Sequence, residues 1–124
     1  MIPKFRAYLN IHKKIVDVQE INYKYKEIVW VNGKYTEVDN FSDIELLQST
    51  GLFDKNGKEI YEGDILHHKV QGTGVVFYPY RDTMASFGIR NVNTNFGRNL
   101  QDTAKAGYEI IGNKFEHQHL LEEE

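Results

Sequence analysis

The fold is decided by residues 27–38, which read EIVWVNGKYTEV. Two runs rich in β-branched and aromatic residues, 27–31 and 34–38, flank the dipeptide Asn32-Gly33. Asn-Gly readily accepts the positive φ angles of a type I′ turn, the tight connection that matches the twist of two antiparallel strands. The stretch therefore predicts a β-hairpin with strands over 27–31 and 34–38.

Similar signals predict short strands along most of the chain. Within residues 4–9 the apolar and polar side chains alternate with the period of two that marks a half-buried strand. Further strands are expected over 15–18, 65–70, 74–78, 86–92 and 108–111, with tight glycine turns at 54–57 and 62–64. Pro79 should end the strand that precedes it.

Three segments are less regular. Residues 41–47 allow a helix capped by Ser42 and Glu45 or a strand, and we expect a short turn or single helical turn that leads into a strand. A short helix is possible over 100–106, and 115–124 should form an acidic terminal turn. The whole pattern predicts an all-β protein, a compact sandwich or small barrel with at most one or two short helical turns.

A length of 124 residues suits a single domain over 1–124, with room for an N-terminal β subdomain (1–48) and a C-terminal one (49–124).

The chain has no cysteine, which excludes disulfides, thiolate zinc sites and cysteine nucleophiles and indicates a reducing compartment. Lys4 and Arg6 interrupt the apolar run at the N-terminus, so a signal peptide is not expected. No apolar run approaches the roughly 20 residues of a membrane span. We therefore expect a cytoplasmic protein without a membrane partner.

The formal net charge of −3 conceals blocks of opposite sign. Residues 1–36 carry seven cations against three anions, and residues 37–64 carry two against eight. Residues 65–107 are again positive and 108–124 negative. Such blocks can complement each other within one subunit or between subunits, and they do not make the acidic chain an obvious nucleic-acid binder.

Residues 47–65, LQSTGLFDKNGKEIYEGDI, strongly resemble the signature of the YopX family, small proteins encoded by phages and prophages of bacteria. Residues 4–8 (KFRAY) are similar to the first strand of that family, and residues 109–113 (EIIGN) with Leu120-Leu121 to its closing segment. The resemblance implies an all-β fold that tends to self-associate, in a family without an established biochemical function. It supplies no catalytic residues, so enzymatic activity is not expected.

Each residue type in this signature also has a structural reason to be there. Gly57 stands where a turn needs a left-handed backbone, and Asp54 and Asp64 are placed to bond backbone amides of their turns. Ile60 and Ile65 should point into a core. The signature therefore identifies a family without identifying an active site.

The side chains that could bind a metal or act in acid–base catalysis do not follow the pattern of a known metal site or active site. His67 and His68 are neighbours in a predicted strand and should face opposite sides, whereas His117 and His119 could share a face. Zinc needs three or four converging ligands, so we expect no metal site and no cofactor. The acidic residues at 59, 62 and 64 border glycine turns, where turn capping explains them better than acid–base catalysis.

In one segment, 77–98, aromatic and cationic side chains are interspersed, a pattern typical of surfaces that bind single-stranded nucleic acid by stacking and phosphate contacts. Its candidate binding residues are Tyr78, Tyr80, Arg81, Phe87, Arg90, Phe96 and Arg98. Our first interpretation is nevertheless a phage or prophage accessory protein that binds a host or phage protein, acts without catalysis and forms a homo-oligomer. The alternative is a nucleic-acid-binding β module that uses 77–98, and an enzyme comes third.

Overall fold

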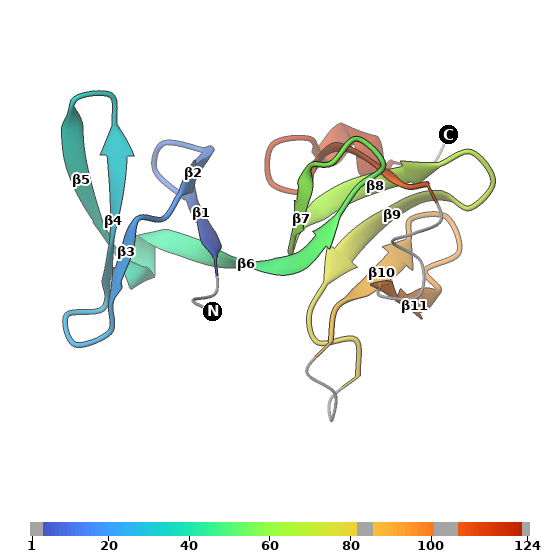
Figure 1. Cartoon of the computed structure of the whole chain (residues 1–124), viewed down its shortest axis with the longest axis horizontal. Coiled ribbons are helices and arrows are strands. Elements are labelled where there is room, and N and C mark those ends of the chain that lie inside the picture. The colour runs from blue at the N-terminus through green and yellow to red at the C-terminus, as the bar shows by residue number, and fades with distance from the viewer. Residues whose placement is uncertain (1–3, 82–85, 101–106, 123–124) are drawn as a thin grey trace. The chain divides into compact units, whose positions relative to one another are not determined.

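The computed structural model of the chain describes residues 4–81, 86–100 and 107–122. The chain forms two compact units, Met1–Gln48 and Ser49–Glu124, and strands dominate both (Figure 1). The helical elements with bounds inside the described residues are two 3-10 turns, η1 (Phe41–Asp43) and η3 (Gln118–Leu121). The predicted all-β class is confirmed.

The first unit contains two small antiparallel sheets. Its strands are β1 (Phe5–Leu9), β2 (Lys14–Asp17), β3 (Glu20–Asn22), β4 (Glu27–Asn32), β5 (Tyr35–Asn40) and the start of β6 (Ile44–Phe53). Strands β3, β4 and β5 form one sheet in that order, while β1 lies between β2 and β6 in the other. Strand β6 continues into the second unit, where Ser49 and Phe53 pair with β7. The short helical turn and the strand expected from residues 41–47 are therefore present as η1 and β6.

The hairpin at 27–38 is present, but its turn lies one residue later than predicted. Asn32 pairs with Tyr35, which leaves Gly33 and Lys34 as the two-residue loop. Gly33 has a φ of +62°, whereas Lys34 is not among the residues with positive φ. Positive φ at the first loop position alone is the pattern of a type II′ turn, so the predicted type I′ turn is wrong. Ser42 and Glu45 also form no capping box, because η1 is preceded by Asn40 and has no side-chain cap.

Alternation along β4 builds the core of the first unit. Ile28 and Trp30 are buried, 0% and 3% exposed, and pack with Ala7, Leu9 and Ile44. The indole N–H of Trp30 donates to Oδ2 of Asp39 across the hairpin at 2.7 Å. The core thus satisfies the polar atom that burial of a tryptophan brings with it.

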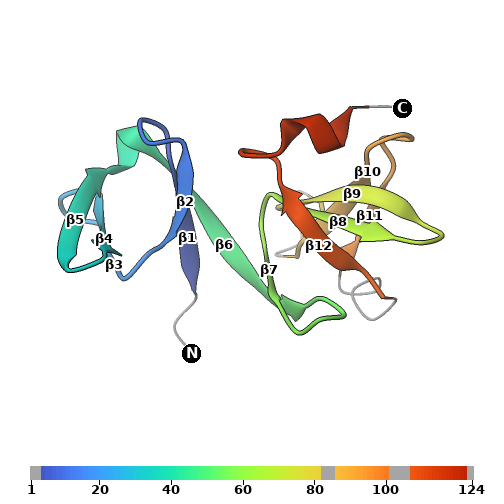
Figure 2. The same cartoon turned by 90° about the horizontal axis from the view of Figure 1, so that it is seen from above.

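The second unit is built on a five-stranded antiparallel sheet with the order β11-β10-β9-β8-β12. The strands of this unit are β7 (Glu59–Tyr61), β8 (Asp64–His68), β9 (Gly72–Phe77), β10 (Gly88–Asn91), β11 (Gly97–Asn99) and β12 (Glu109–Asn113). Of these, β7 pairs with β6 and is not part of the five-stranded sheet. Figure 2 shows β12 beside β8, with η3 following it. We call the face that carries Val76 and Ile89 the inner face. There Ile60, Leu66, Val76, Ile89, Leu100 and Tyr108 form a core whose members are at most 4% exposed.

The turn between β8 and β9 also differs from the prediction. It comprises residues 69–71, so β9 begins at Gly72 instead of Gly74. The imidazole Nδ1 of His68 accepts hydrogen bonds from the N–H groups of Val70 (3.1 Å) and Gln71 (3.0 Å). These two hydrogen bonds stabilise a turn that lies earlier in the sequence than the glycine pattern predicts.

Two further differences concern short elements. Strands β3 and β11, three residues each, were not expected, because so few residues show no clear period. The expected helix over 100–106 falls on residues 101–106, which lie outside the described residues. Among the described residues, no helix is both long and apolar enough to span a membrane.

Candidate binding surfaces

Asp54 organises the turn that carries the family signature. Its Oδ1 accepts hydrogen bonds from the N–H groups of Asn56 (2.9 Å) and Lys58 (2.8 Å), and its Oδ2 accepts one from Ile110 (3.0 Å). The predicted role of Asp54 in its turn is confirmed, and the bond to Ile110 adds a link to β12. Gly57 has the expected left-handed backbone, with a φ of +82°.

The electrostatics of Asp54 follow from these contacts. Burial alone would raise the pKa of its carboxyl, but the three backbone donors and the charge of Lys58 outweigh burial and lower this pKa below 3.8. A carboxylate that accepts three backbone N–H groups has a structural role. Asp54 is therefore explained by the turn and by its link to β12.

The other signature carboxylates are also engaged. Oδ2 of Asp64 accepts the N–H of Tyr61 at 2.7 Å, as predicted for a turn aspartate. The hydroxyl of Ser49 donates to Oε2 of Glu59. Ile60 and Ile65 are fully buried, as expected. The signature region therefore forms a tightly connected scaffold.

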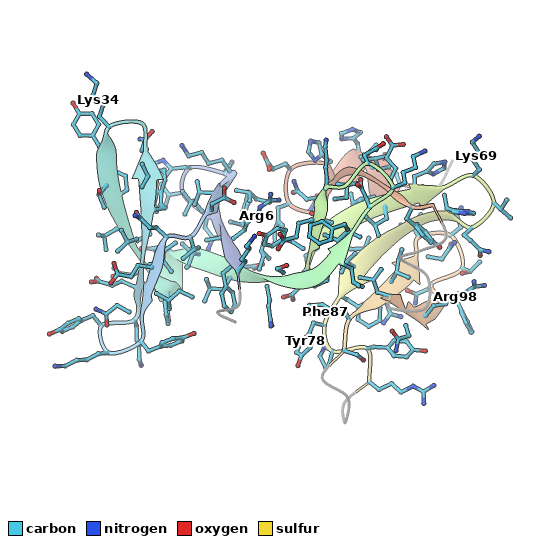
Figure 3. The ribbon with its side chains drawn as sticks, in the orientation of Figure 1. Arg6, Lys34, Lys69, Tyr78, Phe87 and Arg98 are labelled. Carbon is cyan, nitrogen blue, oxygen red and sulfur yellow. The ribbon has the colours of Figure 1, made fainter. Side chains whose placement is uncertain are left out.

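The predicted binding residues of segment 77–98 do not form one surface. The ladder pairs Ile89 with Arg98 and Arg90 with Gly97, so Arg98 lies on the inner face and Arg90 on the opposite, outer face. Figure 3 shows Tyr78 beside Phe87, with Arg98 apart from both. Sequence spacing places these residues near each other along the chain, but the strand pleat distributes them over both faces.

One group of them gathers on the outer face, which we call the outer arginine cluster: Phe77, Tyr80, Arg81 and Arg90. The guanidinium of Arg90 lies 4.6 Å from the centroid of the Phe77 ring, and that of Arg81 lies 5.4 Å from the Tyr80 ring. The two rings are 6.4 Å apart. Phe77 was not among the predicted residues, although it lies in the same segment.

Glycines explain the position of Phe77. A Cβ at Gly88 would lie 2.4 Å from Cζ of Phe77, and one at Gly97 would lie 3.4 Å from the same atom. The ring thus covers two bare backbone positions on neighbouring strands, a known way to protect glycines in sheets. Arg90 covers the ring and also donates from Nη1 to the carbonyl of Asn95 at 3.2 Å. Stabilisation of the sheet accounts for much of this cluster.

The other predicted aromatic residues divide between two places. Tyr78 and Phe87 pack together with ring centroids 4.9 Å apart, and Phe87 also packs against the core. Phe96 and Arg98 line a pocket of about 390 Å³ on the inner face. Phe96 is 65% exposed, so its ring is accessible.

The histidines support the structure around them. His67 contacts Oγ1 of Thr73 at 3.1 Å, while His68 packs on Tyr108 with ring centroids 5.1 Å apart. Nδ1 of His117 accepts the N–H of Asn113, and the rings of His117 and His119 are 6.1 Å apart. In the described part of the chain, no group of three or more His, Asp or Glu residues is arranged to hold a metal ion.

An apolar surface that the sequence analysis did not name lies on β4 and β5. Because Ile28 and Trp30 face the core, Val29 and Val31 face the other way, and Val38 is the cross-strand partner of Val29. Val31 and Val38 are 53% and 54% exposed. We call Val29, Val31, Thr36 and Val38 the valine face. Its signal was present in the sequence: residues 28–31 are all apolar, which indicates a strand that is apolar on both sides.

These features define a small β protein whose polar residues mainly stabilise turns and sheets. The YopX protein family matches residues 4–122, and the chain belongs to this family. No curated protein matches the chain. A similar solved structure is that of protein EF1440 from Enterococcus faecalis, which is 28% identical. The similarity covers 98% of this chain and 99% of that protein, with a TM-score of 0.64.

Proposed function

We propose that the protein is a non-enzymatic binding module of phage or prophage origin that acts in the bacterial cytoplasm as a homo-oligomer. The observation that carries the proposal is the valine face, a β-branched surface that is exposed on the first unit. Contiguous apolar surface on a small protein commonly marks a site of protein association. Self-association would cover it with a second copy of the same face.

Charges at the two ends of the hairpin favour a two-fold arrangement of two copies. Lys34 lies in the loop at the tip, and Glu27 lies at the other end of β4, on the same side as the valines. Figure 3 shows Lys34 at the tip of the hairpin. If two valine faces pack antiparallel, each Lys34 approaches Glu27 of the second copy, so like charges do not meet.

Apolar contact should contribute most of the binding energy. Covering a half-exposed valine stabilises by on the order of 1 kcal/mol, whereas an exposed ion pair contributes about 0–1 kcal/mol. Strand β5 is also an edge strand of its sheet, and a second copy can cover it. Salt should therefore change self-association only modestly.

Gel filtration coupled to light scattering tests this surface. The variant Val31→Lys places a charge on the valine face and should reduce the mass to that of a monomer, 14.5 kDa. Ile11→Lys is the matched control, because Ile11 is 70% exposed and lies outside the valine face. It should leave the mass unchanged. Equal masses for both variants and the unmodified protein would show that the valine face does not mediate assembly.

The outer arginine cluster favours a second candidate, binding of single-stranded nucleic acid. Arg81 and Arg90 are exposed and lie beside aromatic rings, the combination used to contact phosphates and stack bases. The test is fluorescence anisotropy with labelled poly(dT) at low salt, comparing the unmodified protein with Arg81→Gln. Loss of binding in this variant would support nucleic-acid recognition, and absence of binding by the unmodified protein would exclude it.

A further inference from the structure

The pocket of about 390 Å³ on the inner face of the second unit is lined in part by two glycines of β9. Gly72 and Gly74 lie two residues apart on β9. Asn91 of β10 is the cross-strand partner of Gly74, and the side chain of Ile89 packs over Gly74, which is buried. A Cβ at Gly74 would be 2.6 Å from Cγ1 of Ile89. Glycine at this position therefore lets the Ile89 side chain pack directly against the backbone of β9.

The pocket is also lined by Phe96, Arg98 and Tyr108. Arg98 is the only charged residue among the described lining residues. No hydrogen bond or ion pair within the described residues occupies its guanidinium. Because no carboxylate is among the described residues that line the pocket, the charge of Arg98 favours anions there.

Tyr108 strengthens this character. Its side chain is 4% exposed, and burial raises the pKa of its hydroxyl, while the positive charge of Arg98 acts in the opposite direction. The phenol therefore remains protonated at neutral pH and can donate a hydrogen bond. Asn91 is already committed: its Oδ1 accepts the N–H groups of Asn93 and Thr94, and its Nδ2 donates to the carbonyl of Gln71. Arg98 and the Tyr108 hydroxyl thus bring a cation and a hydrogen-bond donor to the pocket.

We propose that this pocket binds a small planar aromatic molecule that carries one anionic group, a carboxylate or a phosphate. The anion pairs with Arg98, whose planar fork can donate two parallel hydrogen bonds, and the ring packs on Phe96. A volume of about 390 Å³ lies within the range of small-molecule sites and admits a molecule of this size. The proposal concerns the second unit alone and does not depend on self-association through the valine face.

Amide NMR titration of the full-length protein tests it, with benzoate and adenosine monophosphate as separate probes. At least one should give saturable shifts at Gly72, Gly74 and Phe96 at concentrations of roughly a few millimolar or less. Saturation by benzoate alone identifies aromatic carboxylates, and saturation by adenosine monophosphate alone identifies nucleotides. Benzamide, which has the ring of benzoate without its charge, should bind at least about tenfold more weakly than benzoate if benzoate binds.

Variants separate the pocket from adventitious binding. Arg98→Gln should weaken binding of the effective probe at least about tenfold, and Phe96→Ala should weaken it several-fold. Lys24→Gln is the matched control, because it removes an exposed cation of the first unit that does not line the pocket, and it should leave the affinity unchanged. Phe96 and Arg98 are both exposed, so neither variant should disturb folding. No saturable binding of either probe, or equal affinity in Arg98→Gln, would overturn the proposal.

Discussion

At the scale of single residues, Asp54 connects parts of the chain that are 56 positions apart. Its two carboxylate oxygens accept three backbone N–H groups, two within the turn and one from β12. Removal of the carboxylate leaves these buried donors unsatisfied, which is more costly than the loss of an exposed interaction. Among the signature residues, Asp54 is therefore the one whose substitution should destabilise the second unit most.

We expect Asp54→Ala to lower the free energy of unfolding by about 2–3 kcal/mol, measured by urea denaturation. Asp17→Ala removes an exposed aspartate that pairs with Arg6 at 3.2 Å, and it should cost less than about 1 kcal/mol. Similar losses in both variants would mean that the bonds of Asp54 add little to stability.

The lowered pKa of Asp54 also sets the sign of a pH dependence. A folded pKa below the ordinary value of 3.8 means that the charged form stabilises the fold above this pH. That contribution is lost as the pH falls through the lower, folded value. The stability difference between the unmodified protein and Asp54→Asn should therefore be constant near neutral pH and shrink below about pH 4. A difference that grows on acidification would contradict this assignment.

Gly57 provides a second test at this scale. Its φ is +82°, and a β-carbon added there would have no atom within 4 Å, so the cost of substitution comes from the backbone alone. Gly57→Val should lower the free energy of unfolding by on the order of 1–2 kcal/mol, and Gly57→Asn by less, because asparagine tolerates a left-handed backbone. Unchanged melting temperatures in thermal denaturation of both variants would show that the turn is not under this constraint.

At the scale of elements, the β4–β5 hairpin depends on a polar contact inside an apolar core. The hydrogen bond from Trp30 to Asp39 crosses the hairpin, and Lys14 of β2 lies over the indole with its Nζ 4.8 Å from the ring centroid. The hairpin is thereby joined to another strand of the first unit by side chains. This is also the element that presents the valine face.

We expect Asp39→Ala to lower the free energy of unfolding by about 1–3 kcal/mol, since the buried indole N–H loses its acceptor. Asp39→Asn keeps an acceptor oxygen and should recover much of the loss. Trp30 is the only tryptophan, so its fluorescence reports directly on this hairpin during denaturation. Equal destabilisation by both substitutions would indicate that charge, rather than the hydrogen bond, is what matters at position 39.

The elements also show how far the sequence could predict this fold. The hairpin, the turns at Gly57 and Asp64 and the apolar residues Ile60 and Ile65 follow from local rules, because turn chemistry and side-chain period act within a few residues. Strands β3 and β11 were missed because three residues carry too little pattern. The hairpin turn was misplaced by one residue because Gly33 suits both the second loop position of a type I′ turn and the first loop position of a type II′ turn.

The candidate surfaces were harder to predict for a different reason. Arg90 and Arg98 are close in sequence, but their ladder positions put them on opposite faces of the sheet. The register between β10 and β11 is needed to assign Arg90 to the outer arginine cluster and Arg98 to the pocket. The pocket also requires Tyr108 and Gly72, which come from outside β10 and β11 and share no motif with Arg98.

At the scale of the whole molecule, the chain belongs to the YopX family and forms two compact β units. Its surfaces differ in character: an apolar face on the first unit, and an anion-selective pocket and an arginine cluster on the second. Self-association through the valine face would use residues of the first unit, whereas the pocket and the arginine cluster belong to the second unit. The central question is therefore whether the protein assembles.

The most direct measurement is the mass of the unmodified protein in solution, determined by light scattering during gel filtration over a micromolar concentration series. Self-association predicts a mass that is a multiple of 14.5 kDa and that decreases toward this value on dilution. Because apolar contact should dominate, raising the salt concentration should change the profile only slightly. A constant mass of 14.5 kDa across the series would contradict the homo-oligomer and leave a monomeric binding module.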